Sequence, residues 1–212
     1  VTAEPEEILA GIQAAGIVGL GGAAFPTHVK LKIPADKHVD TAIINGVECE
    51  PYLTTDHRVM LEQHEDIFEG IRYVLQASGA DRAVIAIEAN KLDAAQHLRE
   101  KMPPDIPAEV QVLPVKYPQG AEKMLVTALL GRQVPSRGLP LDVGALCINV
   151  ATTAEIGRLL PHGRGIQERV ITITGPGVGK KGNYRLPIGT PLRFLLDQVN
   201  PAPTVTRVFM GG

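Results

Sequence analysis

The sequence predicts an α/β fold in which a mostly parallel sheet is covered by helices on both faces. Two observations lead to this prediction. Short apolar runs of strand length alternate with amphipathic helical stretches through the first 160 residues, and turn residues separate them. The chain has 212 residues, which is enough for one such domain and part of a second. Strands that alternate with helices favour a parallel sheet.

The elements follow one another in a regular order. The first helix is predicted from residue 6, where apolar side chains recur at helical spacing until Gly16. Strands are predicted at 41–45, 82–87, 109–115 and 145–150, and helices at 56–79, 91–102, 121–130 and 152–160. In such a Rossmann-like arrangement, ligands bind beyond the carboxyl ends of the strands. The loops near Asn45, Lys116 and Asn149 are therefore the candidate site.

The pattern changes after the turn-rich residues 161–165. Two strands, a helix and a last strand predict a small β-grasp-like module; they span residues 170–174, 184–188, 190–197 and 207–210. We therefore expect an α/β domain over residues 1–165 and a module over residues 166–212. Because the chain begins with Val1 and ends directly after an expected strand, we expect an excerpt of a longer protein and a truncated module.

Composition excludes several classes of function. The 21 Lys and Arg nearly balance the 23 Asp and Glu, so the basic charge of a dedicated nucleic-acid-binding protein is absent. Two cysteines, Cys49 and Cys147, are too few for an iron–sulfur cluster. The histidines show no metal-ligand spacing, so we predict no metal site within the chain. No apolar run is long enough to predict a membrane span.

A glycine-rich segment at 19–26 matches a dinucleotide-binding pattern only in part. Gly19, Gly21 and Ala24 fit the spacing G-x-G-x-x-G/A, and Asp40 lies near the distance expected of a ribose-binding acid. The dinucleotide pattern follows a strand and opens a helix. Here a helix precedes the loop, and Pro26 follows too closely for an ordinary helix start. We therefore do not predict a Rossmann dinucleotide loop.

The same glycines still allow a close approach of the backbone to a ligand. Gly19, Gly21 and Gly22 carry no Cβ, so their N–H groups can face a phosphate or the edge of a flat ring. Lys30 could add a positive charge nearby. For a glycine cluster taken alone, a tight packing turn is the more common explanation, and both interpretations stay open.

An acidic loop, residues 45–51, directly follows the first expected strand. Asn45 offers amide donors and an acceptor, and Glu48 and Glu50 can accept hydrogen bonds from ribose hydroxyls or a flavin N–H. The alternative is a solvated turn that leads into the next helix. Cys49, within this loop, is predicted to be a small packed residue rather than a nucleophile.

Three segments taken together resemble a known family. Residues 19–31 (GLGGAAFPTHVKL), 45–52 (NGVECEPY) and 117–123 (YPQGAEK) are similar to the C subunit of the Rnf electron-transport complex, and more distantly to the flavoprotein subunit of respiratory complex I. Residues 182–194 resemble the soluble-ligand-binding β-grasp module that follows in both families. The resemblance covers almost the whole chain.

This resemblance implies a site for non-covalent FMN with NADH stacked over the flavin. The implied FMN-binding residues are Gly19, Gly21, Gly22, Lys30, Asn45, Glu48, Tyr117, Gly120, Asn149 and Thr153. The implied NADH-binding residues are Phe25, Glu50 and Glu122. No catalytic side chain is implied, because the flavin itself carries the hydride and electron chemistry.

The resemblance also implies a place in a larger assembly. Electrons would pass from NADH through FMN to 4Fe–4S clusters in a later, ferredoxin-like part of the protein, as in ion-translocating NAD:ferredoxin oxidoreductases. The implied partners are other subunits of the membrane complex and NAD(H), with ferredoxin-type carriers reached through other subunits. The implied location is peripheral, on the cytoplasmic side of the bacterial inner membrane.

Some positions depart from the complex I pattern. Leu20 replaces a basic residue and Val47 an acid, so two polar flavin contacts are lost. Ala24, Ala121 and Val150 are further differences. These changes support a second hypothesis, a non-catalytic docking or scaffold module with a degenerate flavin site. A conventional nucleotide-dependent dehydrogenase is disfavoured by the context of the glycine loop.

Overall fold

The computed structural model describes residues 2–211, and the chain divides into two units. The first comprises Val1–Cys49 and Asp56–Ile166, and the second comprises Glu50–Thr55 and Gln167–Gly212. The last two residues of the acidic loop, Glu50 and Pro51, therefore belong to the second unit. No helix in the described part of the chain is long and apolar enough to cross a membrane.

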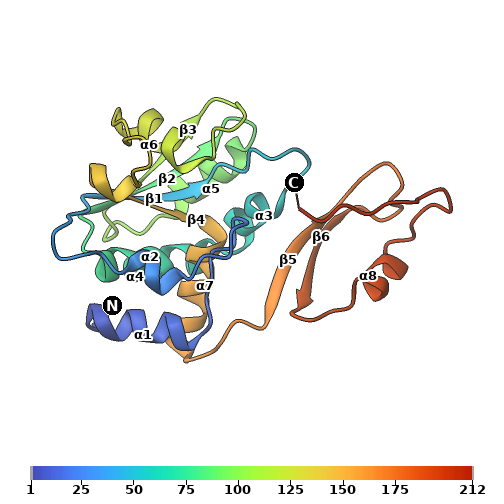
Figure 1. Cartoon of the computed structure of the whole chain (residues 1–212), viewed down its shortest axis with the longest axis horizontal. Helices are drawn as coiled ribbons and strands as arrows, with labels where there is room; N and C mark the ends of the chain where they lie inside the picture. The colour runs from blue at the N-terminus through green and yellow to red at the C-terminus, as the bar shows by residue number, and fades with distance from the viewer. Residues whose placement is uncertain (1, 212) are drawn as a thin grey trace. The chain divides into compact units, whose positions relative to one another are not determined.

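The first unit is built on a parallel four-stranded sheet, as predicted (Figure 1). Its strands are β1 (Thr41–Gly46), β2 (Arg82–Glu88), β3 (Ala108–Leu113) and β4 (Ala145–Asn149), in the order β3-β2-β1-β4. The chain runs outward from β1 to β3 and then returns to pair β4 with the other side of β1. The topological switch point, where ligands bind in open α/β sheets, thus lies between β1 and β4.

Helices cover both faces of this sheet. They are α1 (Pro5–Ala14), α2 (Thr27–Leu31), α3 (Thr55–Glu62), α4 (His64–Ser78), α5 (Leu92–Lys101), α6 (Glu122–Leu130) and α7 (Val150–Leu159). Short 3₁₀ helices span Pro140–Val143 and Leu160–His162. Residues of α1, α4, α5 and α7 share one apolar cluster with the sheet, and α6 packs on the opposite face (Figure 1).

The strand period places alternate side chains in the two clusters. In β1, Ile44 packs with the α4 and α7 side, whereas Ile43 packs with the α6 side. In β4, Ile148 packs on the α4 and α7 side and Cys147 on the α6 side. All four side chains are at most 3% exposed. Burial on both faces explains why these strands read as continuous apolar runs in the sequence.

Two glycines allow α4 and α7 to cross at backbone contact. A Cβ placed on Gly70 would lie 1.9 Å from the carbonyl oxygen of Thr153, and one on Gly157 would lie 2.0 Å from that of Asp66. No real side chain fits at such distances. The packing of α7 against α4, and therefore the place of the α7 N-terminus beside β1, depends on these two glycines.

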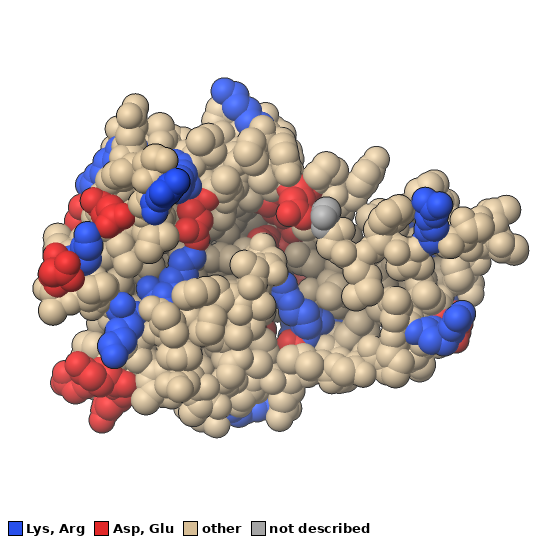
Figure 2. Space-filling model, viewed as in Figure 1, with Lys and Arg blue, Asp and Glu red and all other residues tan. Residues whose placement is uncertain are grey.

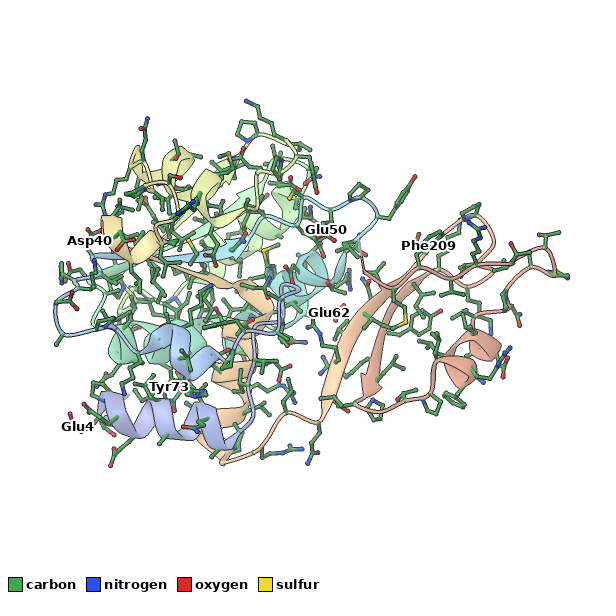
Figure 3. All side chains as sticks on the ribbon, viewed as in Figure 1. Glu4, Asp40, Glu50, Glu62, Tyr73 and Phe209 are labelled. Atoms are coloured by element: carbon green, nitrogen blue, oxygen red, sulfur yellow. The ribbon has the colours of Figure 1, made fainter. Side chains whose placement is uncertain are left out.

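Asp40 lies at the opposite edge of the sheet from the switch point (Figure 3). It directly precedes β1 and accepts hydrogen bonds from Arg132 Nη1 at 2.7 Å and Thr41 Oγ1 at 2.6 Å. Partial burial alone would raise the pKa of Asp40, but these two hydrogen bonds hold the pKa below its usual value. Asp40 is thus a structural anchor at the amino end of the sheet, which agrees with rejecting the dinucleotide pattern.

Two predicted elements and one expectation about Pro26 need correction. The helix expected over 56–79 is two helices, α3 and α4, separated at Gln63. A short helix, α2, does begin directly after Pro26, because proline is tolerated just before the first helical turn, whose N–H groups have no partner within the helix. The strand expected at 207–210 is absent, and Phe209 there is 84% exposed (Figure 3).

The second unit contains an antiparallel pair, β5 (Glu168–Ile173) and β6 (Gly182–Pro187), followed by α8 (Leu192–Gln198). The side-chain amide of Asn183 in β6 donates to the carbonyl oxygen of Thr54 at 3.1 Å and to its Oγ1 at 3.0 Å. Thr172 Oγ1 in β5 accepts from the Thr54 N–H at 3.2 Å. These bonds fasten residues 50–55 to the strand pair.

Candidate functional site at the carboxyl end of the sheet

Two asparagines lie side by side at the switch point. Asn45 and Asn149 are register partners at the carboxyl ends of the parallel strands β1 and β4. Both are half-buried. The loops that the sequence indicates as candidate binding segments all leave the sheet at this edge. The sheet order, rather than the distance along the chain, brings the two asparagines together.

The glycine-rich segment packs against the start of α7. The backbone N–H of Leu20 donates to Thr152 Oγ1 at 2.8 Å. A Cβ on Gly21 would lie 3.3 Å from the Cβ of Asn149, so the backbone of this segment passes closer to Asn149 than most side chains would allow. The segment closes on itself through the Gly19 N–H, which donates to the carbonyl oxygen of Phe25 at 2.8 Å.

Asn149 orders the N-terminus of α7. Its Oδ1 accepts from the Thr152 N–H at 3.1 Å, which makes it the N-cap residue. Its Nδ2 donates to Asp56 Oδ2 at 2.7 Å, and its carbonyl oxygen accepts from Thr153 Oγ1 at 3.1 Å. The positive end of the α7 dipole therefore points toward the glycine-rich segment.

Gly120 joins the third predicted segment to the acidic loop. Asn45 Nδ2 donates to the Gly120 carbonyl oxygen at 2.9 Å, and the Gly120 N–H donates to Cys49 Sγ at 3.4 Å. A Cβ on Gly120 would lie 2.4 Å from the carbonyl oxygen of Val47. The contact of residues 117–121 with the acidic loop therefore requires glycine at this position.

Glu48 holds the start of α3. Its carboxylate accepts from the backbone N–H groups of Asp56, at 3.0 Å, and His57, at 3.3 Å. The residue is 8% exposed. A carboxylate at a helix N-terminus is favoured by the helix dipole and by the unpaired N–H groups there. Glu48 thus joins the middle of the acidic loop to the start of α3, a role that its sequence position alone does not show.

Lys30 and Glu122 form an ion pair between α2 and α6. Both side chains are partly exposed. The resemblance assigns Lys30 to the flavin and Glu122 to NADH, so the structure brings together two residues predicted for neighbouring ligands.

The remaining predicted residues are more exposed. Phe25 is 51% exposed and Tyr117 is 75% exposed, which leaves both aromatic rings accessible for stacking. Glu50 is exposed and belongs to the second unit (Figure 3). On the face shown in Figure 2, acidic and basic side chains are interspersed.

The structure adds residues that sequence reasoning misses. Thr152 accepts a hydrogen bond from the glycine-rich segment and Asp56 accepts one from Asn149, but neither residue is among those predicted to bind a ligand. The signal for Thr152 is its place three residues after an N-cap asparagine.

Burial raises the pKa of the Cys147 thiol to about 12, so this cysteine in β4 is an inert core residue. Among residues 2–211, no three His, Cys, Asp or Glu side chains form a group that could hold a metal ion.

Comparison with known proteins places this arrangement in a family. The model of the Nuo51 FMN-binding domain matches residues 12–158. This match covers the four strands of the first unit and the segments that meet at the carboxyl end of the sheet.

Curated relatives extend the similarity over more of the chain. One is the C subunit of the Na⁺-translocating ferredoxin:NAD⁺ oxidoreductase complex of Acetobacterium woodii, 45% identical over 184 residues, which are 87% of this chain and 42% of that protein. Another is the C subunit of the ion-translocating oxidoreductase complex of Pasteurella multocida, 42% identical over 213 residues, which are 100% of this chain and 25% of that protein. The chain spans less than half the length of these relatives.

Solved structures confirm the fold. A crystal structure of NAD⁺-reducing [NiFe]-hydrogenase in the H₂-reduced state superposes with a TM-score of 0.81 and 24% identity. The superposition covers 93% of this chain and 39% of that chain. The likeness extends to the air-oxidised state, with a TM-score of 0.80.

Proposed function

The chain belongs to the Nuo51 FMN-binding domain family, and on this premise we propose that it binds FMN at the carboxyl ends of β1 and β4 and accepts electrons from NADH. The observation that carries the proposal is the meeting of three segments at the topological switch point. The glycine-rich segment contacts Asn149 and Thr152, and the acidic loop contacts Gly120. This is the position at which open α/β sheets bind flat cofactors.

The residues at this edge suit a flavin mononucleotide. At Gly22 a Cβ would meet nothing within 4 Å, so a flat ring or a phosphate could approach the backbone closely there, and the α7 N-terminus favours an anion. The residues proposed to hold FMN are Gly19, Gly21, Gly22, Lys30, Asn45, Glu48, Tyr117, Gly120, Asn149 and Thr153. Bound FMN would supply the hydride-accepting and single-electron chemistry that amino-acid side chains lack.

Three residues are proposed to bind NADH. The exposed ring of Phe25 offers a stacking face, and the carboxylates of Glu122 and Glu50 can accept hydrogen bonds from ribose hydroxyls. Lys30 pairs with Glu122 and would orient that carboxylate. The role of the protein is then to orient and to stack, with no side chain acting as acid or base.

The wider role is proposed by analogy with the relatives. Electrons would pass from FMN to iron–sulfur clusters outside these residues, in a subunit of an ion-translocating NAD:ferredoxin oxidoreductase. The partners would be the other subunits of that complex, with ferredoxin-type carriers reached through them. The chain would lie peripherally on the cytoplasmic side of the bacterial inner membrane.

We expect the purified chain to bind FMN with one-to-one stoichiometry when the cofactor is added. The flavin band in the visible spectrum should then bleach when NADH is added anaerobically, because hydride transfer reduces the flavin. Isothermal titration calorimetry measures the FMN stoichiometry, and absorbance spectroscopy under anaerobic conditions measures the bleaching. A chain that is folded by circular dichroism but binds no FMN over a range of pH and salt would contradict the proposal.

A second candidate is a docking or scaffold module without catalysis. Two residues favour this candidate. Leu20 and Val47 pack with the apolar clusters, whereas the complex I pattern has polar, flavin-contacting residues at these two positions. Glu50→Gln separates the two candidates. An NADH-binding site loses an ionic acceptor, so the concentration of NADH that half-bleaches the flavin should rise about tenfold, while FMN affinity stays the same. Glu6→Gln, an exposed acid on α1, is the matched control and should bleach as the wild type does; no bleaching by NADH in the wild type and in both variants favours the scaffold.

A further inference from the structure

A buried ion pair lies at the carboxyl end of β2, next to the strand that leads into the acidic loop. Glu88, the last residue of β2, is 1% exposed, and Lys91, just before α5, is 5% exposed. Lys91 Nζ donates to Glu88 Oε2 at 3.0 Å. The parallel register pairs Ile87 with Gly46, so this ion pair lies at the same sheet edge as Asn45.

The ammonium of Lys91 also binds the acidic loop. Besides Glu88 it donates to Asn90 Oδ1 at 3.1 Å and to the main-chain carbonyl oxygen of Glu48 at 3.3 Å. An ammonium has three N–H donors, and these three acceptors use all of them. Two of the acceptors are close neighbours in sequence, whereas Glu48 lies 43 residues away. Lys91 therefore links the end of β2 to the loop after β1.

The start of α5 also reaches Glu48 from another direction. His57, whose N–H donates to the Glu48 carboxylate, has its ring Nε2 2.9 Å from Asp93 Oδ1. Lys91 and Asp93 are two residues apart at the beginning of α5. Glu48 is thus held at its carbonyl oxygen by Lys91 and at its carboxylate by a histidine that Asp93 contacts.

Fold stability alone does not account for the Glu88–Lys91 pair. A buried ion pair loses the hydration of both charges, and replacing such a pair by apolar residues is often neutral or stabilising. Glu88 Oε1 is buried and has no hydrogen-bond partner among residues 2–211, which adds a further cost. Such departures from an optimal interior are expected where a residue serves a site. Here the residue that serves the site is Lys91, through its contact with the acidic loop.

We propose that Lys91 is a positioning residue of the flavin site, a role that rests on the proposed function. Its ammonium, held by Glu88, fixes the carbonyl oxygen of Glu48. It thereby sets the course of residues 45–49, which present Asn45 to the ligand at the switch point. Lys91 acts through the loop and does not itself contact the cofactor.

The test is the double variant Glu88→Gln/Lys91→Met, which removes both charges and leaves no buried ion unpaired. We expect its FMN dissociation constant to rise at least about tenfold, because a loop that must be ordered on binding weakens affinity. Amide hydrogen exchange at residues 47–49 should also speed up about tenfold, with exchange in β4 and α7 unchanged. The matched control is Glu155→Gln/Arg158→Met, another largely buried pair three residues apart. It should leave FMN affinity within about twofold.

The outcomes separate this inference from the proposed function. A folded double variant that binds FMN as the wild type does overturns the role of Lys91. If the wild type itself binds no FMN, the proposed function and with it the flavin role fail, whereas the exchange rates still decide whether Lys91 fixes the loop. If the double variant does not fold, amide hydrogen exchange in the wild type decides whether the loop is fixed. Slow exchange at residues 47–49 without FMN supports the inference, and exchange as fast as in an unfolded peptide overturns it.

Discussion

Gly70→Ala is expected to lower the free energy of unfolding by about 3 kcal/mol or more, toward the upper end of overpacking costs. The added methyl would lie 1.9 Å from the carbonyl oxygen of Thr153, and both sides of this contact are helix backbone that cannot rotate away. The α4–α7 crossing must therefore widen. Gly157→Ala, on the other helix, should have a similar effect because its methyl would lie 2.0 Å from the carbonyl oxygen of Asp66.

Gly11→Ala provides the matched control for this prediction. Gly11 lies within α1, and a Cβ there would have its nearest neighbour, Leu160 Cγ, at 3.8 Å, which is an ordinary contact. This substitution should be neutral or stabilising by up to about 1 kcal/mol, because alanine is the better helix former. Urea unfolding followed by circular dichroism measures all three variants. Equal stability of the Gly70 and Gly11 variants would show that the two helices do not meet at backbone contact.

Gly120→Ala is expected to weaken FMN binding by about a hundredfold while the chain stays folded. A methyl at this position would lie 2.4 Å from the Val47 carbonyl oxygen, so residues 117–121 must move away from the acidic loop. This movement breaks the bond from Asn45 Nδ2 to the Gly120 carbonyl oxygen. A displacement of about 1 Å in a binding site can reduce function about a hundredfold.

The control for Gly120→Ala is Gly165→Ala, whose Cβ would have its nearest neighbour, the Ala15 carbonyl oxygen, at 3.4 Å. It should bind FMN as the wild type does. Fluorescence titration gives both dissociation constants, and circular dichroism confirms that both variants are folded. An unchanged FMN affinity in the Gly120 variant would show that residues 117–121 lie outside the binding site.

Local pattern predicted most of the first unit. Short runs of mainly apolar residues predict the buried strands β1 and β4, and the alternation over residues 82–87 predicts β2. The break at Gln63 was missed because apolar residues recur at helical spacing on both sides of it. The strand expected at 207–210 does not form. An apolar run can form a strand only where a neighbouring strand is present to pair with it, and the run itself does not show whether one is present.

The sequence by itself determined the alternation of strands and helices, the glycine-rich and acidic segments, and the family to which they belong. Only the tertiary structure showed that Asn45 and Asn149 are neighbours, that Glu48 holds α3, and that Lys91 holds Glu48. The physical reason is that periodicity and turn chemistry act over a few residues. The contacts of Asn45 with Asn149 and of Lys91 with Glu48 depend on strand order, and that of Glu48 with α3 depends on the course of the loop between them. The return of the chain to β1 after β3 brings together residues about a hundred positions apart.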